Sequence, residues 1–131
     1  MSSYEILAII GVFGALLAVV HILLVRSVVG NTALAGLLAA GFGAFTAVTI
    51  AHEGVLPVWA NHTANLWGTQ VWWDLLFSVG IALFFIAPRA RKMGMNVPLW
   101  ALLVVLTASI GLLAMIARLF WLERQSEAEA G

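Results

Sequence analysis

Four long apolar segments fill most of this chain and limit what it can fold into. Each runs for 18 or more residues, close to the roughly 20 that a helix needs to cross about 30 Å of hydrocarbon. The segments are residues 4–25, 32–51, 71–88 and 99–122. The sequence therefore predicts an all-α membrane protein, one domain of four transmembrane helices in an up-down bundle.

The composition supports this prediction. Of the 131 residues, 63% are hydrophobic and only 9% are charged, whereas a soluble domain carries about 25% charged residues. The net charge is zero, so the electrostatic footprint of a nucleic-acid-binding protein is absent. The chain has no cysteine, which excludes disulfides, thiolate metal sites and thiol catalysis.

The basic residues predict an orientation. Arg26 lies between the first two apolar segments, and three further basic residues lie in the link 89–98, the inner basic turn. These three are Arg89, Arg91 and Lys92. We expect a multi-pass protein of the cell's inner (cytoplasmic) membrane. Because loops rich in Lys and Arg face the cytoplasm, both termini, the loop 52–70 and the polar tail 123–131 should lie on the outer side. The predicted topology is N-out and C-out.

Small residues predict where helices pack. Helices in lipid approach closely where side chains are small, and the second segment holds two neighbouring rows with i, i+4 spacing. The first row is Gly36, Ala40 and Ala44, and the second is Ala39, Gly43, Ala47 and Ala51. Such rows are also common in ordinary transmembrane bundles. They indicate either packing within the bundle or a face that binds another subunit.

Asp74 and Arg118 are charged residues about one turn inside the outer ends of their predicted helices. Antiparallel neighbours would bring them to a similar depth, and an unpaired charge there costs about 2.5–3.5 kcal/mol. This predicts an ion pair. Alternatively, Asp74 caps its helix and Arg118 extends to the membrane surface.

The histidines are weak candidates for ligands. His52, Glu53 and His62 carry donor atoms for a divalent metal, but their spacing matches no known metal motif. They could instead relay protons or make local hydrogen bonds. His21 could ligate a haem or contact a quinone, although a hydrogen bond to a neighbouring helix is the more ordinary role. The sequence leaves the cofactor unknown.

Four short stretches within about residues 51–125 carry a resemblance to a known family. They are Glu53–Pro57, Ala60–Asn61, Trp73–Leu75 and Arg89–Gly94. Together they resemble the small bacterial membrane proteins of the domain-of-unknown-function family 2834. The resemblance implies a helical bundle and gives weight to Asp74 and the inner basic turn. It implies no substrate, cofactor or activity.

No catalytic constellation can be assembled from the remaining polar residues, so the sequence predicts that the chain is not an enzyme. The leading interpretation is an accessory or structural subunit of a larger membrane complex, binding other subunits or further copies of itself. A small oligomeric transporter or proton-coupled carrier, using the outer polar residues, is the first alternative. The second is a binder of quinone, carotenoid or another apolar cofactor between helices. The residues that would form its wall are Trp72, Trp73, Phe77, Phe84 and Phe85.

Overall fold

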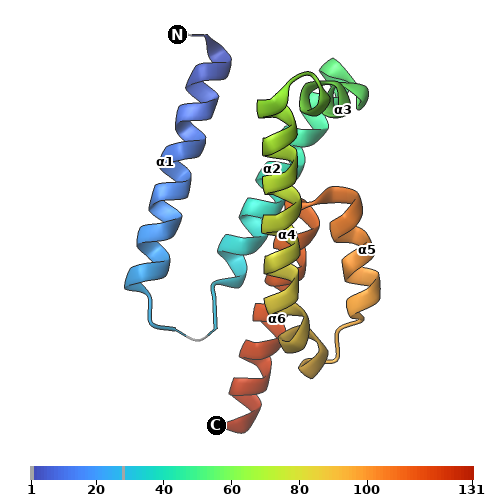
Figure 1. Cartoon of the computed structure of the whole chain (residues 1–131). Coiled ribbons are helices and arrows are strands. Elements are labelled where there is room, and N and C mark those ends of the chain that lie inside the picture. The colour runs from blue at the N-terminus through green and yellow to red at the C-terminus, as the bar shows by residue number, and fades with distance from the viewer. Residues whose placement is uncertain (1, 28) are drawn as a thin grey trace. The chain divides into compact units, whose positions relative to one another are not determined.

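A computed structural model of the protein describes residues 2–27 and 29–131. Within this described part the chain is all-α, with six helices and two compact units, Met1–Gly30 and Asn31–Gly131 (Figure 1). Three helices are long and apolar enough to cross a membrane: α1 (Ser3–Leu24), α2 (Thr32–Glu53) and α4 (Leu66–Lys92). The other helices are α3 (Leu56–Thr63), α5 (Val97–Thr107) and α6 (Ser109–Ala130).

The first unit is the single helix α1. Its start is fixed by a capping box, in which Ser2 accepts a hydrogen bond from the Glu5 backbone N–H and the Glu5 carboxylate accepts one from the Ser2 backbone N–H. None of its described residues is buried. An apolar helix with no buried residue has the surface expected of a segment in contact with lipid.

Asparagines begin three helices of the second unit. The side chains of Asn31, Asn65 and Asn96 each accept a hydrogen bond from the backbone N–H three residues later, at 3.0, 2.8 and 3.2 Å. Each bond satisfies a donor that the first turn of a helix leaves free. Polar residues in an apolar sequence therefore mark the starts of α2, α4 and α5.

The loop predicted over residues 52–70 is largely helical. After Gly54, at φ +80°, the chain forms α3 and then enters α4 at Leu66. The two helices pack closely at Gly68, where an added Cβ would collide with the carbonyl oxygen of Asn61. Glycine is thus needed at this crossing.

The inner basic turn is the end of α4 followed by a tight reversal. The sequence predicted that the helix ends at Pro88. This is wrong, because α4 continues to Lys92. It then closes in a Schellman motif, with hydrogen bonds from Met95 N–H to Ala90 O and from Gly94 N–H to Arg91 O. Gly94 supplies the positive φ of +71° that this motif requires.

The fourth predicted span is not one helix, and the prediction of a four-helix up-down bundle is wrong on this point. Residues 99–122 belong to two helices, α5 and α6, which contact each other and run in opposite directions (Figure 1). The chain reverses at Ala108. Its backbone angles, φ +49° and ψ −118°, lie outside the helical region. Thr107 and Ser109 flank the reversal.

Gly111 allows the two arms of this helical hairpin to meet. A Cβ at this position would lie 2.7 Å from Thr107 Oγ1 and 2.8 Å from the Leu103 carbonyl oxygen. On its other side the hairpin packs against α2, where a Cβ on Gly43 would be in ordinary contact with Ile110 at 3.8 Å. The core of the unit lies between α4, α5 and α6 and includes Ala90 and Met115, both fully buried.

The hairpin also changes the predicted topology within this unit. Since α5 and α6 reverse direction, the end of α6 returns to the end of the unit where α4 finishes. The tail 123–131, predicted to lie on the opposite side, is helical to Ala130 and lies on the same side as Arg89. The prediction that the tail and the inner basic turn lie on opposite sides is therefore wrong.

Replacing Ala108 with glycine tests the reversal. Glycine tolerates this positive φ, whereas alanine is strained by about 1–2 kcal/mol, so Ala108→Gly should raise the stability of the protein by about 1 kcal/mol. In a continuous helix the same change would lower stability by about 1 kcal/mol. The measurement is unfolding in detergent micelles by circular dichroism.

Ala101→Gly is the matched control, because Ala101 lies inside α5. It should lower stability by about 1 kcal/mol. If both variants lose stability equally, residues 99–122 form one straight helix.

Candidate functional site

A pair of side-chain hydrogen bonds joins the end of α4 to α6. Arg89 donates two hydrogen bonds to Glu123, from Nε at 2.9 Å and from Nη2 at 2.7 Å. The Glu123 side chain is 15% exposed and that of Arg89 is 42% exposed. The guanidinium also lies 5.8 Å from the centre of the Phe120 ring. Paired hydrogen bonds of this kind fix both distance and orientation, so this contact holds the two helix ends together.

Arg118 and Asp74 are not brought together. Arg118 lies over the ring of Trp121 at 4.2 Å from its centre, which is close enough for a cation–π interaction. Its helix meets α4 at Arg89, fifteen residues beyond Asp74, a distance of about 22 Å along a helix. The predicted ion pair assumed a straight fourth helix, and the hairpin places Arg118 at the other end of α4.

Asp74 therefore lies within a candidate membrane span without a partner in the described part of the chain. It is exposed, as is Gln70 one turn earlier on α4. Neither side chain makes a hydrogen bond or ion pair with any described residue. Placing a carboxyl group within a membrane span costs free energy unless another polar group pairs with it.

The predicted metal candidates lie at the end of α2 and on α3. His62 Nδ1 donates to the Val58 carbonyl oxygen at 2.6 Å, and its ring lies 5.2 Å from that of Trp72. His52 and Glu53 are exposed in the last turn of α2. No three His, Asp or Glu side chains among residues 2–27 and 29–131 are placed to share a metal ion. His21 is exposed in the last turn of α1.

The two small-residue rows of α2 are divided between its faces. Ala35 is buried, and the half-buried positions follow it along one side of the helix, which packs against α6. They include Gly36, Ala39 and Gly43. The exposed small residues are Ala40, Ala44, Ala47 and Ala51. The side of α2 that packs within the unit thus takes members of both predicted rows.

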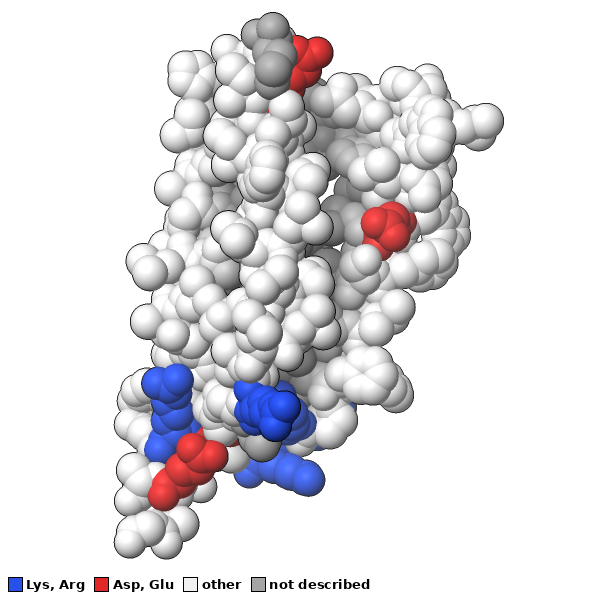
Figure 2. Space-filling model, turned by 90° about the vertical axis from the view of Figure 1, so that its left-hand side faces the viewer, with Lys and Arg blue, Asp and Glu red and all other residues white. Residues whose placement is uncertain are grey.

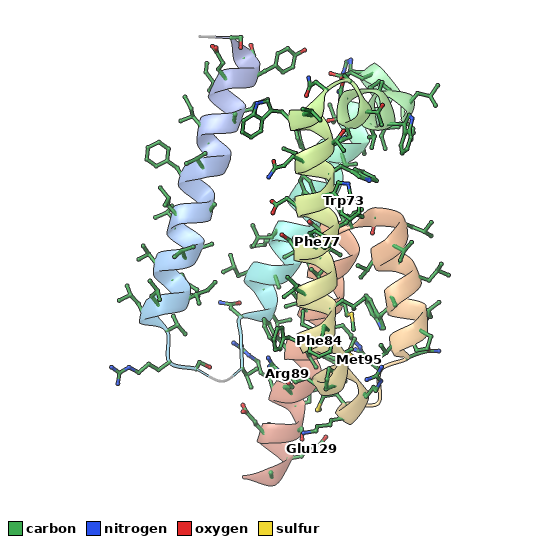
Figure 3. All side chains as sticks on the ribbon, viewed as in Figure 1. Trp73, Phe77, Phe84, Arg89, Met95 and Glu129 are labelled. Atoms are coloured by element: carbon green, nitrogen blue, oxygen red, sulfur yellow. The ribbon has the colours of Figure 1, made fainter. Side chains whose placement is uncertain are left out.

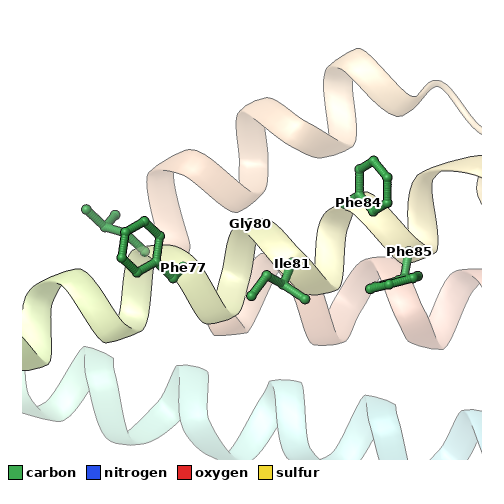
Figure 4. Close-up of a pocket in the computed structure, with 6 residues that line it drawn as sticks. Phe77, Gly80, Ile81, Phe84 and Phe85 are labelled. Carbon is green, nitrogen blue, oxygen red and sulfur yellow. The ribbon is translucent and has the colours of Figure 1, made fainter.

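An aromatic face runs along the exposed side of α4. Phe77, Phe84 and Phe85 are 59–73% exposed and, with Ile81 and Leu76, surround Gly80 in a shallow apolar groove (Figures 3 and 4). Trp73 continues this face, its ring 5.4 Å from that of Phe77. Trp72 does not, because it is half-buried against His62. The aromatic wall predicted for an apolar cofactor is therefore divided between two sides of α4.

Much of the surface of the described helices is uncharged. Figure 2 shows a face on which Lys, Arg, Asp and Glu cover only small areas. The exposed large hydrophobic residues are spread over α1, α2, α4 and α5. An apolar surface of this extent is consistent with contact with lipid.

Sequence reasoning missed two polar features of α4. The Arg89–Glu123 pair was missed because the tail was expected on the opposite side of the membrane. Gln70 was missed because it was considered part of a loop, although it stands four residues before Asp74 on the exposed side of α4. The i, i+4 spacing of two polar residues ahead of an apolar run is the signal that could have identified it.

Comparison with known proteins identifies no family for this chain. Neither a known protein family, nor a curated protein, nor a solved structure matches this chain. The resemblance to the domain-of-unknown-function family 2834 stays a prediction.

A double-mutant cycle on Arg89 and Glu123 tests the contact between α4 and α6. Unfolding free energies of Arg89→Gln, Glu123→Gln and the double variant should give a coupling energy of about 1 kcal/mol, as for a well-oriented, partly exposed pair.

Glu127→Gln is the control, because Glu127 is exposed one turn further along α6. Its coupling to Arg89→Gln should be near zero. An equally small coupling for Glu123 would contradict the observed pairing and the return of α6 to the end of α4.

Proposed function

We propose that this protein is a non-enzymatic accessory or structural subunit of a larger membrane complex, and that it acts by packing its helices against other membrane-embedded chains. The observation that carries this proposal is Asp74. It lies exposed and unpaired, among the described residues, within a candidate membrane span. A group on another chain that donates a hydrogen bond to it would remove this cost.

The small core gives further support. The described buried hydrophobic residues of the second unit are Ala35, Ala87, Ala90, Val97, Val104, Met115 and Leu119. Five of these are alanine or valine residues on α2, α4 and α5, and much of the surface of α2 and α4 remains uncovered. Helices in lipid are held together by close contact and not by the hydrophobic effect. A chain with so few internal contacts fits a role in which neighbouring chains supply more.

A carrier function is less well supported. It required Asp74, Arg118 and the outer histidines along one path. Arg118 lies beside Trp121 near the far end of α4, and His62 is hydrogen bonded to the backbone of its own helix. These residues do not line a common path within the described structure.

We propose a revised topology for the membrane-embedded chain. The positive-inside rule, applied to Arg26 and to the inner basic turn, supports an N-terminus outside and the end of α4 inside. Three spans and a hairpin that enters and leaves on the inner side then place the C-terminus inside. The eleven residues of α5 measure about 16 Å, which would bring Ala108 to about the middle of the bilayer.

The mass of the purified protein tests its role as a subunit. Extraction in a mild detergent followed by native mass spectrometry should give a species heavier than one 14.0 kDa chain, containing further copies or another protein. A chain that is recovered alone at every detergent concentration tested, after crosslinking in the membrane as well, would show that it has no packing partner.

Single cysteines test the topology, because the chain has none of its own. With an impermeant thiol reagent on intact cells, Asn61→Cys should be labelled, whereas Lys92→Cys and Ala128→Cys should be labelled only after the membrane is permeabilised. Labelling of Ala128→Cys but not Lys92→Cys in intact cells would mean that the segment after α4 crosses the membrane.

A further inference from the structure

Most of the basic residues of the chain gather at one end of the second unit. Three of them, Arg89, Arg91 and Lys92, lie in the last turn of α4. Arg118 and Arg124 lie on α6, whose end returns to the end of α4 (Figure 1). The chain has six Lys and Arg residues in all. The other five thus form one group with Arg26 left out, and this group is called the basic end.

The acidic residues near the basic end do not cancel its charge. The Glu123 carboxylate accepts both hydrogen bonds from Arg89, so these two groups neutralise each other. Glu127 and Glu129 lie later on α6, about 6 and 9 Å beyond Glu123 along the helix. They are therefore farther from the apolar part of the unit than the cations are, and the basic end keeps a net positive charge.

Arg91 and Lys92 are available to bind an anion. Both are exposed, and neither pairs with an acidic side chain in the described part of the chain. The last carbonyl groups of α4 accept hydrogen bonds from the turn that follows, from Met93 N–H to Arg89 O and from Gly94 N–H to Arg91 O. Because the backbone closes the helix by itself, neither side chain is needed as a cap.

Arg118 is positioned by an aromatic neighbour. Its guanidinium lies 4.2 Å from the centre of the Trp121 ring, which is 41% exposed. A cation–π interaction uses the charge of the guanidinium and leaves its N–H groups able to donate hydrogen bonds. Tryptophan side chains prefer the headgroup level of a membrane. The pair therefore holds a set of donors at the level where lipid phosphates lie.

The available cations lie within reach of one layer of headgroups. Arg118 precedes Glu123, which meets Arg89, by about 7.5 Å along α6. Arg91 and Lys92 follow Arg89 by about 3 and 4.5 Å. The headgroup region on each side of a bilayer is about 5–8 Å thick, and Lys and Arg side chains extend several ångströms to reach it. A single layer of phosphates can thus contact all three side chains.

We infer that the basic end binds the phosphate groups of anionic phospholipids through Arg91, Lys92 and Arg118. Charge selects this occupant, because each Lys or Arg near an anionic membrane surface strengthens the attraction about fivefold. A zwitterionic headgroup carries a positive charge of its own and gains less. The guanidinium groups can also bind phosphate oxygens in pairs. This inference goes beyond the proposed function, since binding a lipid here requires no protein partner.

Lipid selectivity in liposomes tests the inference. The full chain is reconstituted in phosphatidylcholine, and electron paramagnetic resonance measures how much of a spin-labelled lipid is immobilised by the protein. Phosphatidylglycerol should associate about fivefold more strongly than phosphatidylcholine. The triple variant Arg91→Gln, Lys92→Gln and Arg118→Gln should bring this ratio close to that of a lipid without preference. Equal association of the two lipids with the unaltered protein would overturn the inference.

Arg26→Gln is the matched control, because Arg26 is an exposed basic residue outside the basic end. It should leave the selectivity nearly unchanged, whereas Arg118→Gln should lower it about twofold. Arg118→Lys keeps the charge and should retain most of the selectivity. A loss in Arg26→Gln as large as that in Arg118→Gln would mean that the attraction is spread over all cations, and the inference would be wrong.

Inorganic phosphate distinguishes lipid from a soluble anion. Replacing chloride with phosphate at constant ionic strength should leave the selectivity unchanged, because lipids confined to the bilayer have a far higher effective concentration at this end. Loss of the preference in phosphate would show that the site takes a soluble anion, which contradicts the inference.

A measurement without substitutions guards against variants that misfold. Native mass spectrometry of the unaltered protein, released from mild detergent with equal amounts of the two lipids, should show phosphatidylglycerol retained in preference to phosphatidylcholine. Equal retention would overturn the inference. A protein partner present or absent in the same spectra decides the proposed function separately.

Discussion

Inside a bilayer no water is available to hydrogen bond with a free backbone group, so a chain that bends there must bury the bend in protein. The reversal at Ala108 is half-buried, and α6, which follows it, packs against both α5 and α2. Ala108 is itself bonded, its N–H donating to Val104 O and its carbonyl accepting from Leu112 N–H. The direction of α6, the position of the tail and the Arg89–Glu123 pair all depend on this bend.

Small residues make the bend possible. Gly111 removes a side chain that would collide with Thr107 and Leu103, and Gly43 lies where α2 meets Ile110 of α6. Close approach of helices at such positions replaces the hydrophobic effect, which is weak between helices surrounded by lipid. At the far end of the hairpin, the bidentate pair of Arg89 and Glu123 holds α6 against α4. The second unit is thus fixed by close backbone contact at one end and by a polar contact at the other.

The faces left uncovered are as informative as the core. α4 uses one side for α5 and α6 and leaves the other to present a polar pair above an aromatic stripe. An apolar stripe alone suits lipid equally well. Gln70 and Asp74 make the difference, because lipid chains offer neither donors nor acceptors to such groups. A function based on assembly accounts for these two residues together with the phenylalanines beneath them.

The all-α class and the three long helices that could cross a membrane could be predicted from the sequence, because they depend on local apolar length. The helix starts at Asn65 and Asn96 were not predicted, because the predicted apolar segments begin at residues 71 and 99. The sequence could not decide whether residues 99–122 continue straight. That segment is apolar throughout, and the choice at Ala108 depends on whether Gly111 and α2 are positioned to accept a bend. For the same reason the sequence paired Asp74 with Arg118, whereas the tertiary structure pairs Glu123 with Arg89. Which charges meet follows from the direction of a helix, and that direction is decided by packing between distant parts of the chain.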